Sequence, residues 1–228
     1  MRARFKAITL DLDDTLWPID RVIERAEAVL HGWLEQHAPE VARALPPASF
    51  AAYRRALALE LPSLAHDFTA LRREALRRAL GQYGADGVLA EPAMEVFLAA
   101  RNEVEFYPDA LAALQRLSRH YSVVSLSNGN ADLTRIGVDH YFVATVSPRS
   151  VGVAKPDARI FHAACARVDS LPAQVLHVGD DPDLDVRGAL SAGVGTVWVN
   201  RQNKAWIDKP AQTVEVRDLL ALCEWLGV

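Results

Sequence analysis

Cysteine is scarce in this chain, and no charge of one sign dominates it. Only two cysteines, Cys165 and Cys223, occur among the 228 residues, and both fall in expected helices with apolar neighbours. They support neither a disulfide framework nor a thiolate metal site, so we expect both to be small buried residues. The formal net charge is -4 at pH 7, which gives no basic footprint for nucleic acid.

Long hydrophobic runs are absent as well. No stretch reaches the roughly 18 continuous apolar residues of a membrane-spanning helix. The basic N-terminus runs straight into an apolar strand pattern, which leaves no separate signal-peptide core. The sequence therefore predicts a cytoplasmic chain with no membrane partner, and it specifies no oligomeric state. Half of the residues are hydrophobic (50%), which is enough to bury a large core.

Five short apolar runs, rich in β-branched residues, predict buried strands. They lie at Ala7–Leu10, Tyr121–Leu126, Phe142–Val146, Val175–Val178 and Thr196–Val199. Apolar residues at helical spacing predict helices between the later strands, at Asp109–His120, Ala158–Val168 and Val186–Ala192. Alternating strands and helices predict an α/β fold with a Rossmann-like parallel sheet flanked by helices.

Residues 18–104 break this alternation, because they contain helical patterns and no convincing strand. The patterns lie at Arg21–Glu35, Ser49–Leu61, Phe68–Tyr83 and Pro92–Asn102. We therefore expect an all-helical domain at 18–104, inserted after the first strand into a core domain made of 1–17 and 105–228. The arginine-rich stretch from Arg72 to Arg78 predicts a solvated helix face.

The most informative polar residues follow the first expected strand. Asp11 and Asp13 are one residue apart, so both side chains can project the same way from the strand end. Two like charges that close need a cation or a shared proton between them. An all-oxygen site suits Mg2+, which commonly keeps a substrate phosphate oxygen among its ligands. Asp14 or Thr15 could instead mark an ordinary helix cap or turn.

Three further strand ends supply the remaining groups for phosphoryl transfer. These groups are a hydroxyl, an amide, a lysine and two acids: Ser127, Asn128, Lys155, Asp180 and Asp185. Ligands bind beyond the carboxyl ends of parallel strands, so all of these side chains should meet at one edge of the sheet. Each also has an ordinary interpretation, because hydroxyl, amide and acid groups cap helices and a lysine before proline often lies in an exposed turn.

Together, these motifs resemble those of the haloacid dehalogenase (HAD) superfamily of phosphohydrolases. Asp11-Leu12-Asp13-Asp14-Thr15 resembles the first motif, Ser127 the second, Lys155 the third, and Asp180 with Asp185 the fourth. The helical insert resembles the C1-type cap, so the resemblance covers nearly the whole chain. The residues around Ser127 and Lys155 further resemble a branch that includes bacterial flavin mononucleotide (FMN) phosphatases and 5'-nucleotidases.

This resemblance implies a Mg2+-dependent phosphomonoester hydrolase. Its small-molecule substrate would be FMN, a nucleotide or a sugar phosphate, and the reaction would pass through an aspartyl-phosphate. The resemblance assigns Asp11 as the nucleophile and Asp13 as the general acid and base. It places the substrate phosphate on Ser127, Asn128 and Lys155.

The resemblance also implies a metal site. Mg2+ would be held by the Asp11 carboxylate, the Asp13 main-chain carbonyl and the Asp180 carboxylate, while Asp185 would orient the bound waters.

Three other functions stay open. A phosphomutase would keep every motif. A 2-haloacid dehalogenase, by family resemblance, lacks the second acid that Asp13 supplies, and a non-catalytic binding protein is expected to lose motif acids. His66, Arg72 and Trp33 are candidate substrate contacts in the insert, although packing or a solvated face is the ordinary interpretation of such residues.

Overall fold

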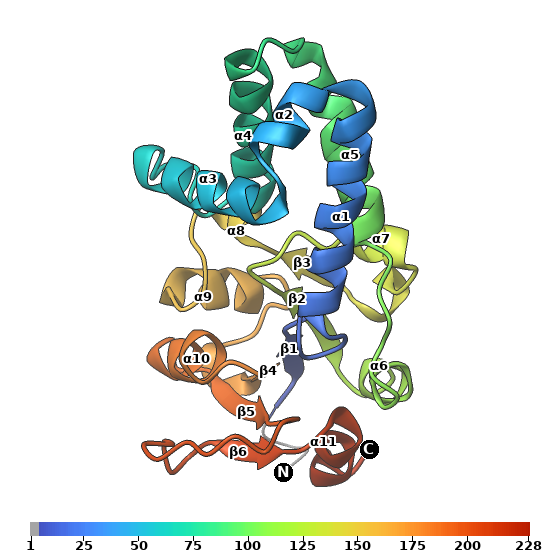
Figure 1. Cartoon of the computed structure of the whole chain (residues 1–228). Coiled ribbons are helices and arrows are strands. Elements are labelled where there is room, and N and C mark those ends of the chain that lie inside the picture. Colours follow the sequence, from blue (N-terminus) through green and yellow to red (C-terminus); the bar gives the residue numbers. More distant parts are fainter. Residues whose placement is uncertain (1–4) are drawn as a thin grey trace. The chain divides into compact units, whose positions relative to one another are not determined.

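The computed structural model of the protein describes residues 5–228 and divides into two units (Figure 1). The first unit comprises the described residues up to Pro18, together with 105–129 and 137–228. The second comprises 19–104 and 130–136. Residues 1–4, which form part of the basic N-terminus considered for a signal peptide, lie outside the described residues.

A six-stranded sheet forms the centre of the first unit. Its strands are β1 (Ala7–Leu10), β2 (Ser122–Leu126), β3 (Ala144–Val146), β4 (Val175–Gly179), β5 (Gly195–Val199) and β6 (Val214–Val216). The spatial order is β3-β2-β1-β4-β5-β6, and every neighbouring pair is parallel. This topology confirms the predicted Rossmann-like fold and brings the carboxyl ends of the strands to one edge.

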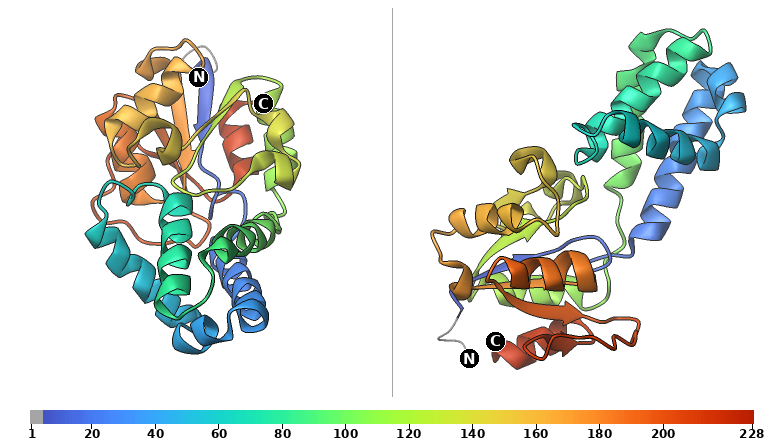
Figure 2. Two further views of the ribbon diagram at one scale, coloured as in Figure 1. Left: turned by 90° about the horizontal axis from the view of Figure 1, so that it is seen from above. Right: turned by 90° about the vertical axis from the view of Figure 1, so that its left-hand side faces the viewer.

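Helices cover both faces of this sheet (Figures 1 and 2). One face carries α9 (Ala158–Ala166) and α10 (Gly188–Ser191), and the other carries α6 (Ala110–Ser118) and α11 (Leu219–Leu226). The short elements α8 (Pro148–Val151), η2 (Asp139–Tyr141) and η3 (Pro172–Gln174) complete the unit. Cys165 and Cys223 are buried, as predicted.

Some elements of the first unit differ from the sequence prediction, and helix α11 was not predicted at all. Strand β6 was not predicted, because only Val216 of its three residues is buried and the apolar run is too short to stand out. The helix predicted at Val186 begins earlier, as a π-helical turn η4 (Pro182–Arg187) that leads into α10. Asp181 causes this early start, since its Oδ1 accepts hydrogen bonds from the amides of Asp183 and Leu184, both at 2.8 Å.

The second unit is entirely helical, as predicted. It contains α1 (Ile19–His37), α2 (Pro39–Ala44), α3 (Pro47–Glu60), α4 (Phe68–Gln82), η1 (Gly87–Leu89), α5 (Ala90–Arg101) and α7 (Leu133–Ile136). Helix α2 was not predicted, because a six-residue helix that begins with proline has too few apolar positions to show a period. The unit has its own apolar core, which includes Leu30, Leu76 and Phe97.

The predicted solvated face from Arg72 to Arg78 is wrong at its first residue. Arg77 is exposed, Arg78 is half-buried, and both pair with Glu74, but Arg72 is only 3% exposed. The reason is helical spacing, because Arg72 shares the face of α4 that also buries Ala75 and Leu76.

The segment 130–136 belongs with the helices, although it follows β2 in sequence. Nδ2 of Asn130 donates to Thr69 Oγ1 at 3.2 Å, and the amide of Asp132 donates to Asn102 Oδ1 at 2.8 Å. Arg135 forms an ion pair with Glu95 at 2.7 Å. The chain therefore passes between the two units four times, after residues 18, 104, 129 and 136.

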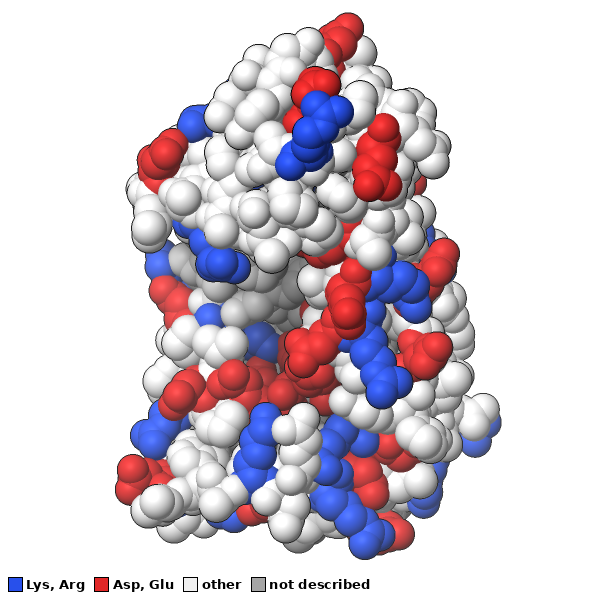
Figure 3. Space-filling view, viewed as in Figure 1, with Lys and Arg blue, Asp and Glu red and all other residues white. Residues whose placement is uncertain are grey.

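Charged side chains of both signs are interspersed on the face shown in Figure 3, without a continuous basic patch there. Among the residues that the structure describes, no helix has both the length and the hydropathy needed to cross a membrane.

Candidate active site

The first motif is a tight turn at the carboxyl end of β1. The amide of Asp11 donates to Val178 O at 2.9 Å, so the pairing of β1 with β4 continues up to this residue. The chain then turns through Asp14, whose φ of 59° lies in the left-handed region that Asp tolerates better than most residues. Beyond the turn, Nε1 of Trp17 donates to Asp13 Oδ1 at 2.8 Å. The sheet thus positions Asp11, and an indole positions Asp13.

Lys155 lies buried between two carboxylates. Its side chain is 3% exposed, and Nζ contacts Oδ1 of Asp11 at 2.5 Å and Oδ1 of Asp185 at 2.6 Å. Asn128 fixes the lysine backbone from both sides, because its Oδ1 accepts from Lys155 N at 2.8 Å and its Nδ2 donates to Lys155 O at 3.0 Å. This geometry excludes the exposed-turn interpretation of Lys155.

Ser127 directly follows β2, which pairs with β1, so it lies at the same edge of the sheet as Asp11. It is buried, and its Oγ accepts a hydrogen bond from the Gly129 amide at 2.9 Å. It does not cap the next helix, because the amide of Thr134 is bound by Asp132 Oδ1 at 3.0 Å instead.

Asp185 is held from three directions inside the first unit. Oδ1 accepts from Lys155 and from Nε2 of His177 at 2.9 Å, and Oδ2 accepts from the Asp181 amide at 3.0 Å. Gly179 makes room for it, since a Cβ there would lie 2.3 Å from the Asp185 carboxyl carbon. The cap at this turn is Asp181, so the interpretation of Asp185 as a helix cap is excluded.

The four acids and bases of the site carry an excess of negative charge. Burial raises the pKa of Asp11 well above its usual range, and only Lys155 opposes this shift. Burial, with Asp185 and Asp14 nearby, raises the pKa of Asp180 to about 7. Burial also opposes ionisation of Asp185, yet Lys155 and His177 outweigh it and hold its pKa well below the usual range. The positive charge of Lys155 is thus matched by the negative charge of Asp185, while the negative charges of Asp11 and Asp180 stay unbalanced.

A divalent cation fits this arrangement. Asp11, Asp180 and Asp185 each offer an oxygen, and these atoms all lie within 4.8 Å of one another. The donors are carboxylate oxygens only, which hard cations such as Mg2+ prefer. Both oxygens of Asp185 already accept hydrogen bonds, so Asp11 and Asp180 are the better direct ligands.

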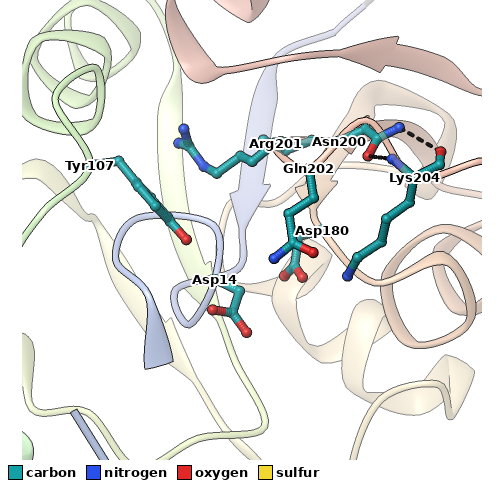
Figure 4. Close-up of a pocket in the computed structure, with 8 residues that line it drawn as sticks. Asp14, Tyr107, Asp180, Asn200, Arg201, Gln202 and Lys204 are labelled. Carbon is teal, nitrogen blue, oxygen red and sulfur yellow. Dashed lines mark hydrogen bonds between the residues drawn. The ribbon is translucent and has the colours of Figure 1, made fainter. Parts of the chain in front are cut away.

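A small pocket adjoins Asp180 in the first unit (Figure 4). Its volume is ≈ 40 Å³, and Asp14, Tyr107 and Arg201 contribute to its walls. Such a volume holds about three or four water molecules and not a metabolite, since one water needs roughly 10–15 Å³ measured in this way. The pocket therefore gives water access to Asp180.

Sequence reasoning missed His177, which lies within β4. Its Nδ1 is 2.8 Å from Thr9 Oγ1 on the neighbouring strand, and its Nε2 contacts Asp185. Burial lowers its pKa, although the hydrogen bond with Asp185 opposes that shift. The available signal was a polar pair, Thr9 and His177, inside two otherwise apolar strands. No ligand spacing marked it, because the partners come from different strands.

We expect His177→Leu to lower the free energy of unfolding by about 2 kcal/mol or more, because it leaves the buried Thr9 hydroxyl without its partner and removes one of the hydrogen bonds to Asp185. Urea unfolding of the purified variant measures this loss. His162→Leu is the matched control, since His162 is exposed and should change the free energy by less than about 0.5 kcal/mol. An equal loss of unfolding free energy in both variants would mean that the buried hydrogen bonds of His177 contribute no more to stability than a surface histidine does.

The comparisons with known proteins agree with this geometry. The haloacid dehalogenase-like hydrolase family matches residues 5–193. A phosphoserine phosphatase of Thermus thermophilus is 30% identical, over 94% of this chain and 96% of the relative. The 5-amino-6-(5-phospho-D-ribitylamino)uracil phosphatase of Escherichia coli is 26% identical, over 96% of this chain and 95% of that protein.

A solved structure extends the likeness to three dimensions. The crystal structure of a 2-haloacid dehalogenase from Pseudomonas syringae superposes with a TM-score of 0.90 at 35% identity, and the match covers 97% of this chain and 99% of the other. The family match over most of the sequence, the parallel sheet and the carboxyl-edge acids all lead to one assignment. The chain belongs to the haloacid dehalogenase-like hydrolase family.

Proposed function

We propose that the protein is a Mg2+-dependent phosphomonoester hydrolase that works through an aspartyl-phosphate on Asp11. One observation carries this proposal: Lys155 is held between Asp11 and Asp185, with Asp180 close enough to share a cation with Asp11. Such a site combines a carboxylate nucleophile with positive charge for a phosphoryl group. The coarser prediction of a HAD-type phosphatase is confirmed by relatives that match nearly the whole chain and are named as phosphatases.

Asp11 would attack the phosphorus atom. Its Oδ1 is engaged by Lys155, so Oδ2 is the oxygen that forms the bond to phosphorus while the bond to the leaving oxygen breaks. Lys155 and the Ser127 hydroxyl would hold the phosphoryl oxygens, and the positive charge of Lys155 offsets the repulsion between phosphate and carboxylate.

Asp13 would move the protons. Its carboxyl group protonates the leaving oxygen in the first step and takes a proton from the attacking water in the second. The hydrogen bond from Trp17 to Oδ1 fixes the orientation of the group.

Mg2+ would be held by Asp11, the Asp13 carbonyl and Asp180. Asp185 would stabilise the site through its ion pair with Lys155. The bound cation supplies charge neutralisation for the phosphoryl group. The helical unit, residues 18–104 in the predicted division, would act as a cap that excludes water and selects the leaving group. A small phosphomonoester is the only partner we propose, and a cytoplasmic location stays a prediction.

Phosphate release tests this function directly. The panel contains FMN, nucleoside monophosphates, sugar phosphates and phosphoglycolate, each assayed with and without Mg2+. We expect Mg2+-dependent release from at least one substrate. Release of an isomerised sugar phosphate in place of free phosphate would instead identify a phosphomutase.

A 2-haloacid dehalogenase is the second candidate, favoured by the 35% identical solved structure. Asp13 argues against it, because halide is a weak base and leaves without a proton, so an orienting indole on a second acid would have no use. Chloride release from 2-chloropropionate separates the two functions. Dehalogenation without phosphate release would overturn the phosphatase proposal.

Mg2+ binding can be measured without turnover. At saturating Mg2+ we expect the melting temperature of the protein to rise by about 5 °C, since a ligand that binds only the folded state stabilises it by mass action. Asp180→Asn should abolish this shift, because it removes a direct ligand. Asp183→Asn is the control, because Asp183 is exposed and pairs with Arg187. An unchanged shift in Asp180→Asn would contradict the metal site.

A further inference from the structure

Arg201 lies two residues after β5, and its guanidinium joins two other segments of the first unit. Nη1 and Nη2 donate to the two carboxylate oxygens of Asp109, both at 2.9 Å. Nη2 and Nε also donate to the main-chain oxygen of Thr15, at 2.8 and 3.2 Å. A planar guanidinium that donates to two partners at once fixes their geometry, which a single ammonium group cannot do.

The guanidinium of Arg201 is itself held in place. Its Cζ lies 4.0 Å from the centroid of the Tyr107 ring, and Figure 4 shows the side chain extending toward that ring. Asp109 accepts a further hydrogen bond from the Leu219 amide at 2.8 Å, which ties it to the start of α11. Burial opposes ionisation of Asp109, but Arg201 and the Leu219 amide outweigh it and lower the pKa of the carboxyl group. With a side chain that is 13% exposed, Arg201 is a fixed group of the first unit.

Thr15 connects Arg201 to the candidate metal site. It is fully buried, and it follows Asp13 and Asp14 in the turn of the first motif. Its hydroxyl donates to Oδ1 of Asp180 at 3.3 Å. Threonine is stiff at χ1, so a backbone held by Arg201 also sets the direction of this hydroxyl. Arg201 and Asp180 line the same small pocket, which places the three residues in one local network (Figure 4).

We propose that Arg201 is a positioning residue that orients Asp180 for Mg2+ through Thr15. This inference rests on the Mg2+ site of the proposed function, in which Asp180 is a direct ligand. A carboxylate that is oriented before the cation arrives binds it more tightly, because less freedom is lost on binding. Arg201 thus raises the affinity for a cation that it does not itself contact.

Isothermal titration calorimetry with Mg2+ alone tests the proposal on the full chain. We expect Arg201→Gln to raise the dissociation constant for Mg2+ by about fivefold or more. The sign of the change is informative, because the substitution removes a positive charge, and charge alone would make cation binding tighter. An unchanged or lower dissociation constant would overturn the proposal.

Thr15→Val tests the route from Arg201 to Asp180. Valine removes the hydroxyl but keeps the main-chain oxygen to which Arg201 donates, and we expect it to raise the dissociation constant by about tenfold. If Arg201 acts through Thr15, the double variant binds Mg2+ within about twofold of Thr15→Val alone. Multiplication of the two single effects would mean that Arg201 acts by another route, which contradicts the proposal.

Arg187→Gln is the matched control in the same unit. Arg187 also pairs with an aspartate and lies over an aromatic ring, with Asp183 at 3.0 Å and the Trp206 centroid at 5.4 Å. These partners lie outside the first motif, so its dissociation constant should stay within about twofold of the wild type. An equal rise in both arginine variants would show a general effect of lost charge and refute the role of Arg201.

Arg201→Lys covers the case in which Arg201→Gln does not fold. Lysine keeps a positive charge beside Asp109, but its ammonium lacks the fork that spans Asp109 and Thr15. We expect this variant to unfold in urea with EDTA near the wild-type midpoint and still to raise the dissociation constant by about threefold or more. A purely structural role predicts a lower midpoint with wild-type Mg2+ affinity, and that result would overturn the proposal.

Wild-type binding separates failure of this inference from failure of the proposed function. A folded wild-type protein that binds no Mg2+ would refute the metal site, and with it both the Mg2+-dependent function and the role of Arg201. Equal Mg2+ affinity in the wild type and Arg201→Gln, together with Mg2+-dependent phosphate release, would refute the inference alone and leave the phosphatase intact.

Discussion

Asp11→Asn should lower the rate of phosphate release by at least about 10⁴-fold and leave the fold unchanged. The amide has the shape of the carboxylate, but it cannot form a stable bond to phosphorus. Lys155 keeps its pairing with Asp185, so the buried lysine is not left without a counter-ion. Mg2+-dependent release is measured on the best substrate of the panel, and circular dichroism with urea unfolding checks the fold.

Asp183→Asn is the control for this substitution. Asp183 lies between Asp180 and Asp185 in the fourth motif, but its side chain is exposed and pairs with Arg187. It should keep nearly full activity, because it touches none of the reacting groups. Metal-dependent turnover that survives in Asp11→Asn would contradict the aspartyl-phosphate mechanism.

Lys155→Met should cause the largest loss of stability, about 3–5 kcal/mol in the free energy of unfolding. Methionine fills the space of the lysine stem but removes the charge that Asp11 and Asp185 share. Two buried carboxylates are then left facing each other, and one of them must take up a proton or move toward water. Urea unfolding at neutral pH in the presence of EDTA measures the loss without help from a metal.

Lys209→Met is the surface counterpart of this experiment. Lys209 pairs with Glu215, but both side chains are about one-third exposed. Its loss should cost less than about 1 kcal/mol, since water screens such a pair. If both lysine variants were destabilised equally, Lys155 would be an ordinary ion pair and not the centre of a buried charge network.

Sequence patterns predicted the local elements of the fold because local forces form them. Strand β1 lies at the predicted residues, since a short run of β-branched and apolar residues buried on both faces has few alternatives. Strand β6 shows the limit of this reasoning, because its pairing with β5 gives only one buried side chain. The capping role of Asp181 was also hidden, because several acids in one loop offer equivalent caps.

Asp11, Ser127 and Asp180 were predicted as site residues because each directly follows a strand, and Lys155 and Asp185 because they lie in the segments that follow β3 and β4. His177 was not predicted, because its importance depends on its hydrogen bonds with Thr9 and Asp185. Thr9 is far from it in the sequence, and Asp185 comes into contact with it only in the folded structure. Arg72 was misjudged for a related reason. An arginine on an amphipathic helix is usually solvated, and only the packing of α1 and α5 around α4 shows that this one is buried.

Because residues 130–136 belong to the helical unit, an exchange of this unit between related proteins involves two separate segments of the sequence. A chimaera that exchanged only residues 19–104 with a relative would bring foreign partners to Asn130, Asp132 and Arg135. The exchanged module would have to include both segments, although they are separated in the sequence by residues 105–129, which contain α6 and β2. The two segments therefore have to change together, and an exchange of residues 19–104 alone would break the contacts that residues 130–136 make with the helices.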